Sequence, residues 1–187
     1  YDDYCPEPQP ITDDGYDVML NMCSLWREGY HSNWGAISAF PDIEPALGYY
    51  DEGIVEVADW EIKFMVENGI DVQHLCWYCG QNDITVPMKK TNHNNALHEG
   101  FFNAKYSDMM KFTFMWENSG VNCKNLEQFK EYIWKYWMDY YFLDDRFYTI
   151  DNKIVITVWS RNSFKKAFGD TYEGCMEAIN FMNEDAK

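Results

Sequence analysis

Short apolar runs alternate along the chain with longer stretches whose apolar residues recur at helical spacing. The short runs lie at residues 16–23, 70–78, 110–116 and 153–159 and predict buried strands. Helices are predicted after each of them, at residues 53–68, 95–105, 125–140 and 171–183. Strands that alternate with helices favour right-handed crossovers and a parallel sheet, so the pattern predicts an α/β fold of the (β/α)-barrel type.

Several helix ends and turns carry recognisable signals. Asp51 is the expected N-cap of the first helix and Gly69 its expected C-cap. Asn125 and Gln128 resemble a capping box, and Asp151-Asn152 predicts a turn into the last strand. One face of the helix after Asn125 is expected to be apolar and consists of Leu126, Phe129, Ile133, Trp137 and Tyr140.

Side chains alternate between the two faces of each predicted strand. If polar residues face the interior of a barrel, the inward set is Asn21, Gln73, Trp77, Thr113, Glu117, Thr157 and Trp159. Active sites of such folds lie at the carboxyl ends of the strands. This places Trp77, Glu117 and Trp159 at the mouth, with Trp26 just beyond the first strand.

Length and charge restrict the possible functions. The chain has 187 residues and a formal net charge of −16, so one domain is expected and nucleic acid or an anionic membrane is a poor partner. No apolar run approaches the length of a membrane span. Aromatic residues make up 18% of the chain, an unusually large share, and with 47% hydrophobic residues the composition predicts a globular protein.

Some of these aromatic residues are candidates for sugar binding. Trp and Tyr rings present flat apolar faces that match the C–H face of a sugar ring. Trp26, Trp77, Tyr78 and Trp159 cluster at predicted strand ends and are therefore the expected sugar platforms. The alternative is that each of them belongs to the core, where Trp is usually found.

Glu117 is the candidate catalytic carboxylate. It ends a strongly apolar strand, where an acidic side chain is costly to desolvate without a task or a partner. Asn118 follows it and is a further candidate for sugar binding. Glycoside hydrolysis normally uses two carboxylates, and the loop residues Asp51 and Asp83 are weaker candidates for the second. The alternative is that Glu117 lies exposed in the next loop.

Six cysteines are sparse and irregularly spaced, unlike a disulfide framework. Cys76 and Cys79 form a CxxC at the end of a strand, whereas redox pairs lie at a helix N-terminus. A zinc site would need further ligands such as His74, His93 or His98. Buried structural thiols are the favoured interpretation, and no metal or cofactor is expected.

Several segments together resemble the glycoside hydrolase family 99-like group, which includes endo-α-mannosidases and WbsX-type proteins of polysaccharide clusters. The similarity extends over about residues 17–159, and its segments are Leu47–Asp51, Glu61–Ile62, Glu67–Val72, Cys76–Tyr78, Phe114–Asn118 and Thr149–Ile156. The resemblance implies a (β/α)₈ barrel that acts on glycosides. In the endo-mannosidases the Glu that matches Glu117 acts as a base on the sugar 2-hydroxyl, and a second Glu three residues later is the acid. Here Gly120 takes that position, which is closer to the WbsX-type proteins, whereas Trp26 matches the family's Trp.

A complete barrel of this type needs about 250 residues, so residues 1–187 are expected to be one partial domain of about four βα units, with residues 1–16 as an irregular arm. The rest of the barrel would come from the same longer chain or from another copy. Three functions compete: a glycoside hydrolase, a non-hydrolytic glycan-binding or polysaccharide-assembly protein, and a thiol oxidoreductase. The glycan interpretation predicts a periplasmic or secreted protein.

Overall fold

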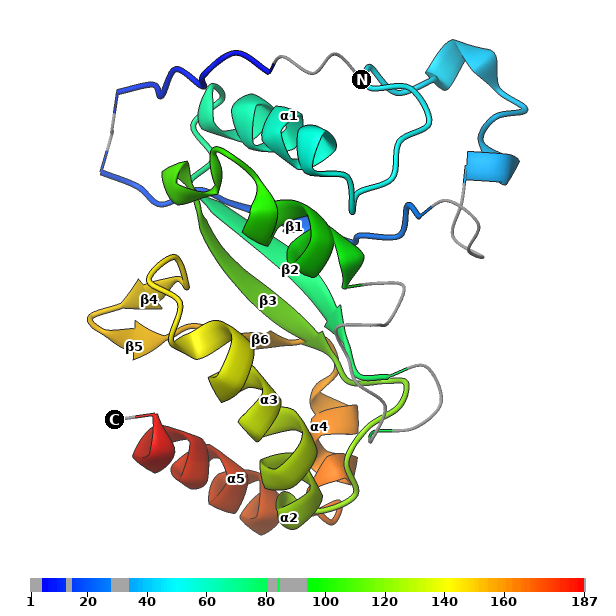
Figure 1. The fold of residues 1–187 in the computed structure, drawn as a ribbon. Helices are drawn as coiled ribbons and strands as arrows, with labels where there is room; N and C mark the ends of the chain where they lie inside the picture. The colour runs from blue at the N-terminus through cyan, green and yellow to red at the C-terminus, as the bar shows by residue number, and fades with distance from the viewer. Residues whose placement is uncertain (1–4, 13–14, 28–33, 81–83, 85–93, 187) are drawn as a thin grey trace. The chain divides into compact units, whose positions relative to one another are not determined.

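The computed structural model describes residues 5–12, 15–27, 34–80, 84 and 94–186. Four strands form a sheet in the order β1-β2-β3-β6, with parallel pairing of β1 with β2 and of β3 with β6 (Figure 1). These strands are β1 Met19–Met22, β2 Val72–Tyr78, β3 Lys111–Glu117 and β6 Thr157–Val158. The predicted α/β class with a parallel sheet is confirmed.

The helices and the small hairpin fill the connections. The helices are α1 Val55–Val66, α2 Leu126–Gln128, α3 Lys135–Trp137, α4 Arg161–Ala167 and α5 Tyr172–Asp185, and the hairpin consists of β4 Thr149–Ile150 and β5 Lys153–Ile154. Shorter helical turns lie at Trp34–Ala36, Pro41–Ile43, Ala96–Gly100, Phe101–Asn103, Ser107–Met109, Phe129–Trp134 and Met138–Phe142. Within the described part of the chain, no helix is both long and apolar enough to cross a membrane.

Contacts group the chain into two compact units. The first comprises Tyr1–Leu75 and Lys89–Lys111, and the second comprises Cys76–Met88 and Phe112–Lys187. Each unit has its own buried core, and each is described below by itself.

In the first unit, α1 packs its apolar stripe onto the helical turns that precede β3. Val57, Ala58, Ile62 and Met65 of this stripe are buried. Gly69 ends the helix as predicted, because its φ of +73° is left-handed and the next N–H, of Ile70, donates to the Met65 carbonyl at 3.0 Å.

The predicted N-cap of this helix is wrong by three residues. Ile54 occupies the cap position of α1 without a side-chain hydrogen bond. Asp51 instead accepts from the Gly53 N–H at 2.7 Å, so its carboxylate closes a turn ahead of the helix. Gly100 is required by a close approach of two backbone segments in the first unit, because an added Cβ would lie 2.4 Å from the Glu52 carbonyl oxygen.

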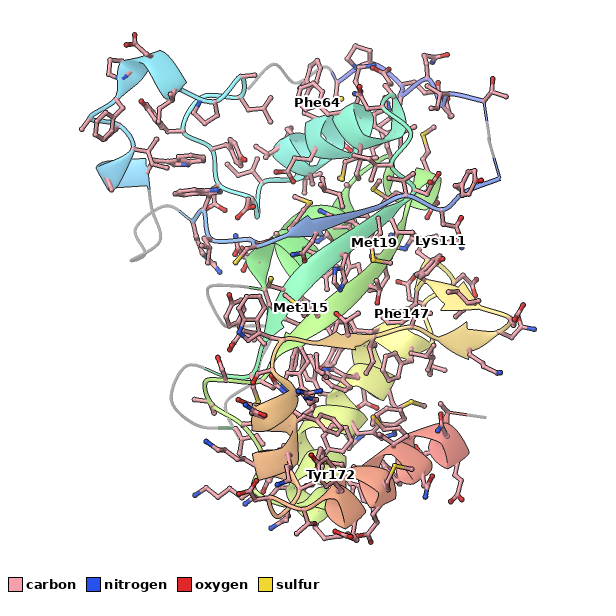
Figure 2. All side chains as sticks on the ribbon, turned by 180° about the vertical axis from the view of Figure 1, so that it is seen from behind. Met19, Phe64, Lys111, Met115, Phe147 and Tyr172 are labelled. Carbon is pink, nitrogen blue, oxygen red and sulfur yellow. The ribbon has the colours of Figure 1, made fainter. Side chains whose placement is uncertain are left out.

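The second unit has a core of aromatic side chains between β3 and the long helical stretch of residues 126–142. Phe112, Phe114 and Trp116 of β3 are buried. Their rings contact Phe129, Trp137 and Tyr141. Phe147, labelled in Figure 2, closes this core 5.2 Å from the Phe112 ring.

The capping box at the start of this stretch is present in altered form. The Gln128 N–H donates to the Asn125 side chain at 2.9 Å. The Gln128 side chain reaches back to the N–H of Lys124 rather than to that of the cap residue. The predicted apolar face is correct through Trp137, but its last member is Tyr141 and not Tyr140, which is 41% exposed. Wide helical turns at Phe129–Trp134 and Met138–Phe142 rotate the face by one residue.

The strand predicted at residues 153–159 is two strands. Asp151 and Asn152 both have positive φ and form the turn of the β4–β5 hairpin. The turn was expected from the sequence, whereas the hairpin was not. After Ile154 the chain leaves that hairpin and joins the main sheet as β6. The helix α4 was not expected from the sequence; Ser160 caps it by accepting from the Ser163 N–H.

Candidate functional site

Glu117 is the last residue of β3 and lies in the second unit. Phe112, Phe114 and Trp116 alternate with it along the strand and pack on the helical stretch. Side chains of a strand point alternately to opposite faces, so Glu117 projects from the face opposite this aromatic core, together with Met115. The strand therefore holds the carboxylate at its carboxyl end, half-exposed.

The Glu117 carboxylate is held by its own following turn. Its Oε1 accepts from the Ser119 N–H at 3.2 Å and from the Ser119 hydroxyl. Its Oε2 accepts a longer bond from the Gly120 N–H at 3.4 Å. Donors on both oxygens fix the orientation of the side chain and favour a carboxylate as hydrogen-bond acceptor.

Trp159 directly follows β6, as Glu117 ends β3. In the parallel register Met115 pairs with Thr157 and Trp116 with Val158, and the Trp159 N–H donates to the Trp116 carbonyl at 2.9 Å. The backbones of Glu117 and Trp159 therefore lie at the same end of two paired strands. Trp159 is 62% exposed, so an aromatic residue open to solvent comes at the strand end that carries the carboxylate.

Asn118, the residue after Glu117, is buried and does not face solvent. The residue is 1% exposed. Its Nδ2 donates to the Ser160 carbonyl at 3.0 Å, and its Oδ1 accepts from the Ser160 N–H at 2.9 Å. The amide thus joins the end of β3 to the residue after Trp159.

Trp77 does not lie at an open mouth, contrary to the face assigned from the sequence. It is 1% exposed, packs edge-on against Trp137 with ring centroids 5.3 Å apart, and donates from Nε1 to the Tyr141 hydroxyl at 2.9 Å. Almost every residue of β2 is buried, so its polar-apolar alternation carried no information about which face meets the helices. Tyr78, the next residue, is half-buried at the end of β2.

Trp26 lies in the first unit, where it stacks on Trp34 with ring centroids 3.7 Å apart and planes inclined by 8°. Two hydrogen bonds join its backbone to Glu52. The Trp26 N–H donates to Glu52 Oε2 at 2.7 Å, and the Glu52 N–H donates to the Trp26 carbonyl at 3.0 Å. Glu52 was not among the residues singled out from the sequence.

The structure shows Glu52 to be a buried carboxyl group, 3% exposed. Burial, with a further contribution from the charge of Glu61, raises the pKa of Glu52 to about 8. Burial also raises the pKa of Glu61 to about 7. Glu52 precedes α1 and Glu61 lies within it, and no spacing in the sequence signals that the two interact.

The two weaker carboxylate candidates add nothing to the Glu117 site. Asp51 is engaged in the first unit by Gly53 and by Asn95, whose Nδ2 donates to it at 3.1 Å. Asp83 lies outside the described residues, as does the possible zinc ligand His93.

Cys79 of the CxxC and Cys123 do not have the character of reactive thiols. Burial raises the pKa of Cys79 to about 12 and that of Cys123 to about 12. A nucleophilic or redox-active thiol needs the opposite shift. This environment argues against the thiol oxidoreductase alternative.

Comparison with known proteins identifies a similar fold. No family model matches the chain, and no curated protein matches it in sequence. Among solved structures, a GH99 endo-α-mannosidase from Bacteroides thetaiotaomicron superposes with a TM-score of 0.53 at 17% sequence identity. The match covers 87% of this chain and 48% of the mannosidase chain. The fold is GH99-like. The chain spans about half the length of this barrel enzyme.

Proposed function

We propose that this chain is part of a glycoside hydrolase in which Glu117 is the catalytic carboxylate and Trp159 the sugar platform. The observation that supports the proposal is the register of β3 and β6, which brings the half-exposed Glu117 and the exposed Trp159 to the same end of two paired strands. A sugar ring stacked on the indole would bring its hydroxyl and glycosidic oxygens within reach of that carboxylate. The GH99-like fold supports a carbohydrate-active protein.

The carboxylate would act as a base or nucleophile. Both of its oxygens accept hydrogen bonds from the turn that follows, an arrangement that suits an ionised acceptor more than a proton donor. Hydrolysis normally needs a second carboxyl group to protonate the leaving oxygen. We propose that this group belongs to the remaining part of the barrel, carried by the same longer chain or by another copy, and that the protein acts on extracytoplasmic glycans.

A substitution at Glu117 tests the proposal. The protein is incubated with a panel of polysaccharides that includes α-mannan, chosen because the structural neighbour is an endo-α-mannosidase, and new reducing ends are measured. Glu117→Gln should abolish turnover while affinity electrophoresis still shows sugar binding. Glu127→Gln is the matched control, since that side chain is 83% exposed on α2 in the same unit. Turnover that survives Glu117→Gln would remove Glu117 from the mechanism.

A second function is favoured by one specific observation. A Cβ added at Gly120 would lie 3.5 Å from Glu117 Oε2, an ordinary contact, so position 120 adjoins the carboxylate but carries no acid. A protein with one carboxylate at this point would bind a glycan without cleaving it. Tight binding of an oligosaccharide that stays intact through long incubation of the wild-type protein would favour this alternative.

A further inference from the structure

Asn118 joins three segments of the second unit. It directly follows β3, its carbonyl accepts from the Asn122 side chain at 2.9 Å, and its amide side chain pairs with both backbone groups of Ser160. Ser160 in turn caps α4 by accepting from the Ser163 N–H at 3.2 Å. One buried amide therefore connects the ends of two strands and the start of a helix.

The pairing with Ser160 acts on Trp159. The Trp159 N–H is bound to the Trp116 carbonyl, and the next N–H, of Ser160, is bound to Asn118 Oδ1. The backbone of Trp159 is thus held on both sides at the end of a strand that is otherwise only two residues long. An exposed indole on so short a strand depends on these bonds for a defined position.

We propose that Asn118 is a positioning residue that acts through Ser160 to hold the Trp159 indole at the strand end that carries the Glu117 carboxylate. The proposal rests on the proposed function, in which the indole and the carboxylate engage the same sugar. Asn118 does not touch the sugar itself.

Direct sugar binding by Asn118 is disfavoured by its contacts. To reach a ligand, the amide would have to release the Ser160 N–H and carbonyl, which lie at the base of α4 and would lose their partner. Leaving buried backbone groups unpaired costs more than a hydrogen bond to a solvated sugar hydroxyl returns. The amide is therefore better explained as a fixed support.

The position of Trp159 can be observed directly by ¹⁹F NMR of protein labelled with 5-fluorotryptophan. The chain has eight Trp residues, and the spectrum of Trp159→Phe assigns the resonance of Trp159. The test variants are Asn118→Ala, which removes the amide, and Asn118→Asp, which keeps an acceptor for the Ser160 N–H. Asn183→Ala on the exposed side of α5 is the matched control.

If Asn118 positions Trp159, Asn118→Ala shifts and narrows the Trp159 resonance as the indole becomes mobile, Asn118→Asp restores it in part, and Asn183→Ala leaves it unchanged. With an α-mannan oligosaccharide as probe, Kd should rise about tenfold in Asn118→Ala. An unchanged Trp159 resonance in the folded Asn118→Ala protein overturns the proposal, whether or not affinity falls. If Asn118→Ala does not fold, Asn118→Asp decides by the same resonance. Failure of the wild-type protein to bind any sugar would contradict the proposed function, while the resonance would still decide the role of Asn118.

Discussion

Trp77 donates its indole N–H to the hydroxyl of Tyr141 at 2.9 Å inside the aromatic core of the second unit. Both residues are almost wholly buried, and burial raises the pKa of Tyr141 well above its ordinary value, so its hydroxyl stays protonated. The bond ties the end of β2 to the helical stretch of residues 126–142. A residue whose type suggests a sugar platform is here a structural element.

Trp77→Phe should therefore destabilise the protein. The change leaves a cavity and removes the donor to the Tyr141 hydroxyl, and we expect the free energy of unfolding to fall by about 2 kcal/mol. Trp159→Phe, the same change at an exposed site, should alter it by less than about 0.5 kcal/mol. Urea unfolding followed by far-ultraviolet circular dichroism measures both. Equal losses in the two variants would contradict the different environments assigned to them.

Trp159→Ala should weaken glycan binding without affecting folding. Loss of the stacking surface is expected to raise Kd for an oligosaccharide about tenfold, measured by isothermal titration calorimetry. Tyr172→Ala is a suitable control, because Tyr172 is also a strongly exposed aromatic residue of the second unit, at the start of α5 (Figure 2). Similar losses of affinity in both variants would show that Trp159 has no special role.

The buried Glu52, with the half-buried Glu61, should make stability depend on pH around neutrality. The pKa of Glu52 is raised from 4.5 to about 8, so the folded state holds a proton that the unfolded state has released between these values. The free energy of unfolding therefore falls as pH rises from about 5 to 9, by an amount on the order of 4 kcal/mol.

Glu52→Gln tests the origin of this pH dependence. An amide oxygen can still accept from the Trp26 N–H, but the group no longer titrates, so the slope of stability against pH should decrease. Glu56→Gln, on the exposed side of α1, should retain the wild-type slope. Urea unfolding at several pH values gives the comparison, and an unchanged slope in Glu52→Gln would place the titrating group elsewhere.

Gly120→Glu should fold and should distinguish the two proposed functions. Gly120 has no positive φ, and a Cβ there meets only the Glu117 carboxylate at 3.5 Å. If the wild-type protein binds glycans without cleaving them because it lacks a second acid, this variant should release reducing ends faster than wild type. Gly120→Gln, with the same size and no acid, is the control. Equal rates in the two variants would show that an acid at position 120 does not supply the missing chemistry.

Cys79 and Cys123 should react slowly with thiol reagents. Both are buried, and their pKa values of about 12 leave almost no thiolate at pH 8. Alkylation by iodoacetamide followed by peptide mass spectrometry should modify the exposed Cys23 first. Rapid modification of Cys79 in the folded protein would revive the oxidoreductase alternative.

Local signals in the sequence were sufficient for several elements. Gly69 ends α1 because only a left-handed residue closes that turn without strain, and Asn125 begins the long helical stretch by a hydrogen bond to a residue three positions away. The hairpin at Asp151-Asn152 was missed. Its turn was visible, but the short strands on either side merge with neighbouring apolar residues. The shift from Tyr140 to Tyr141 was also not visible, because the wide helical turns have no signature in residue spacing.

The sequence by itself determined the alternation of strands and helices, the parallel sheet and the position of Glu117 at a strand end, since these depend on periodicity and on neighbours along the chain. Only the tertiary structure decided which aromatic residues are exposed. Trp77 is the last residue but one of β2 and Trp159 directly follows β6, yet one is packed against Trp137 and the other is open to solvent. The same holds for Asn118 and Glu52, whose partners lie 42 and 26 residues away in the chain. Burial and hydrogen bonding of this kind depend on which segments meet in space, and residue type does not specify that.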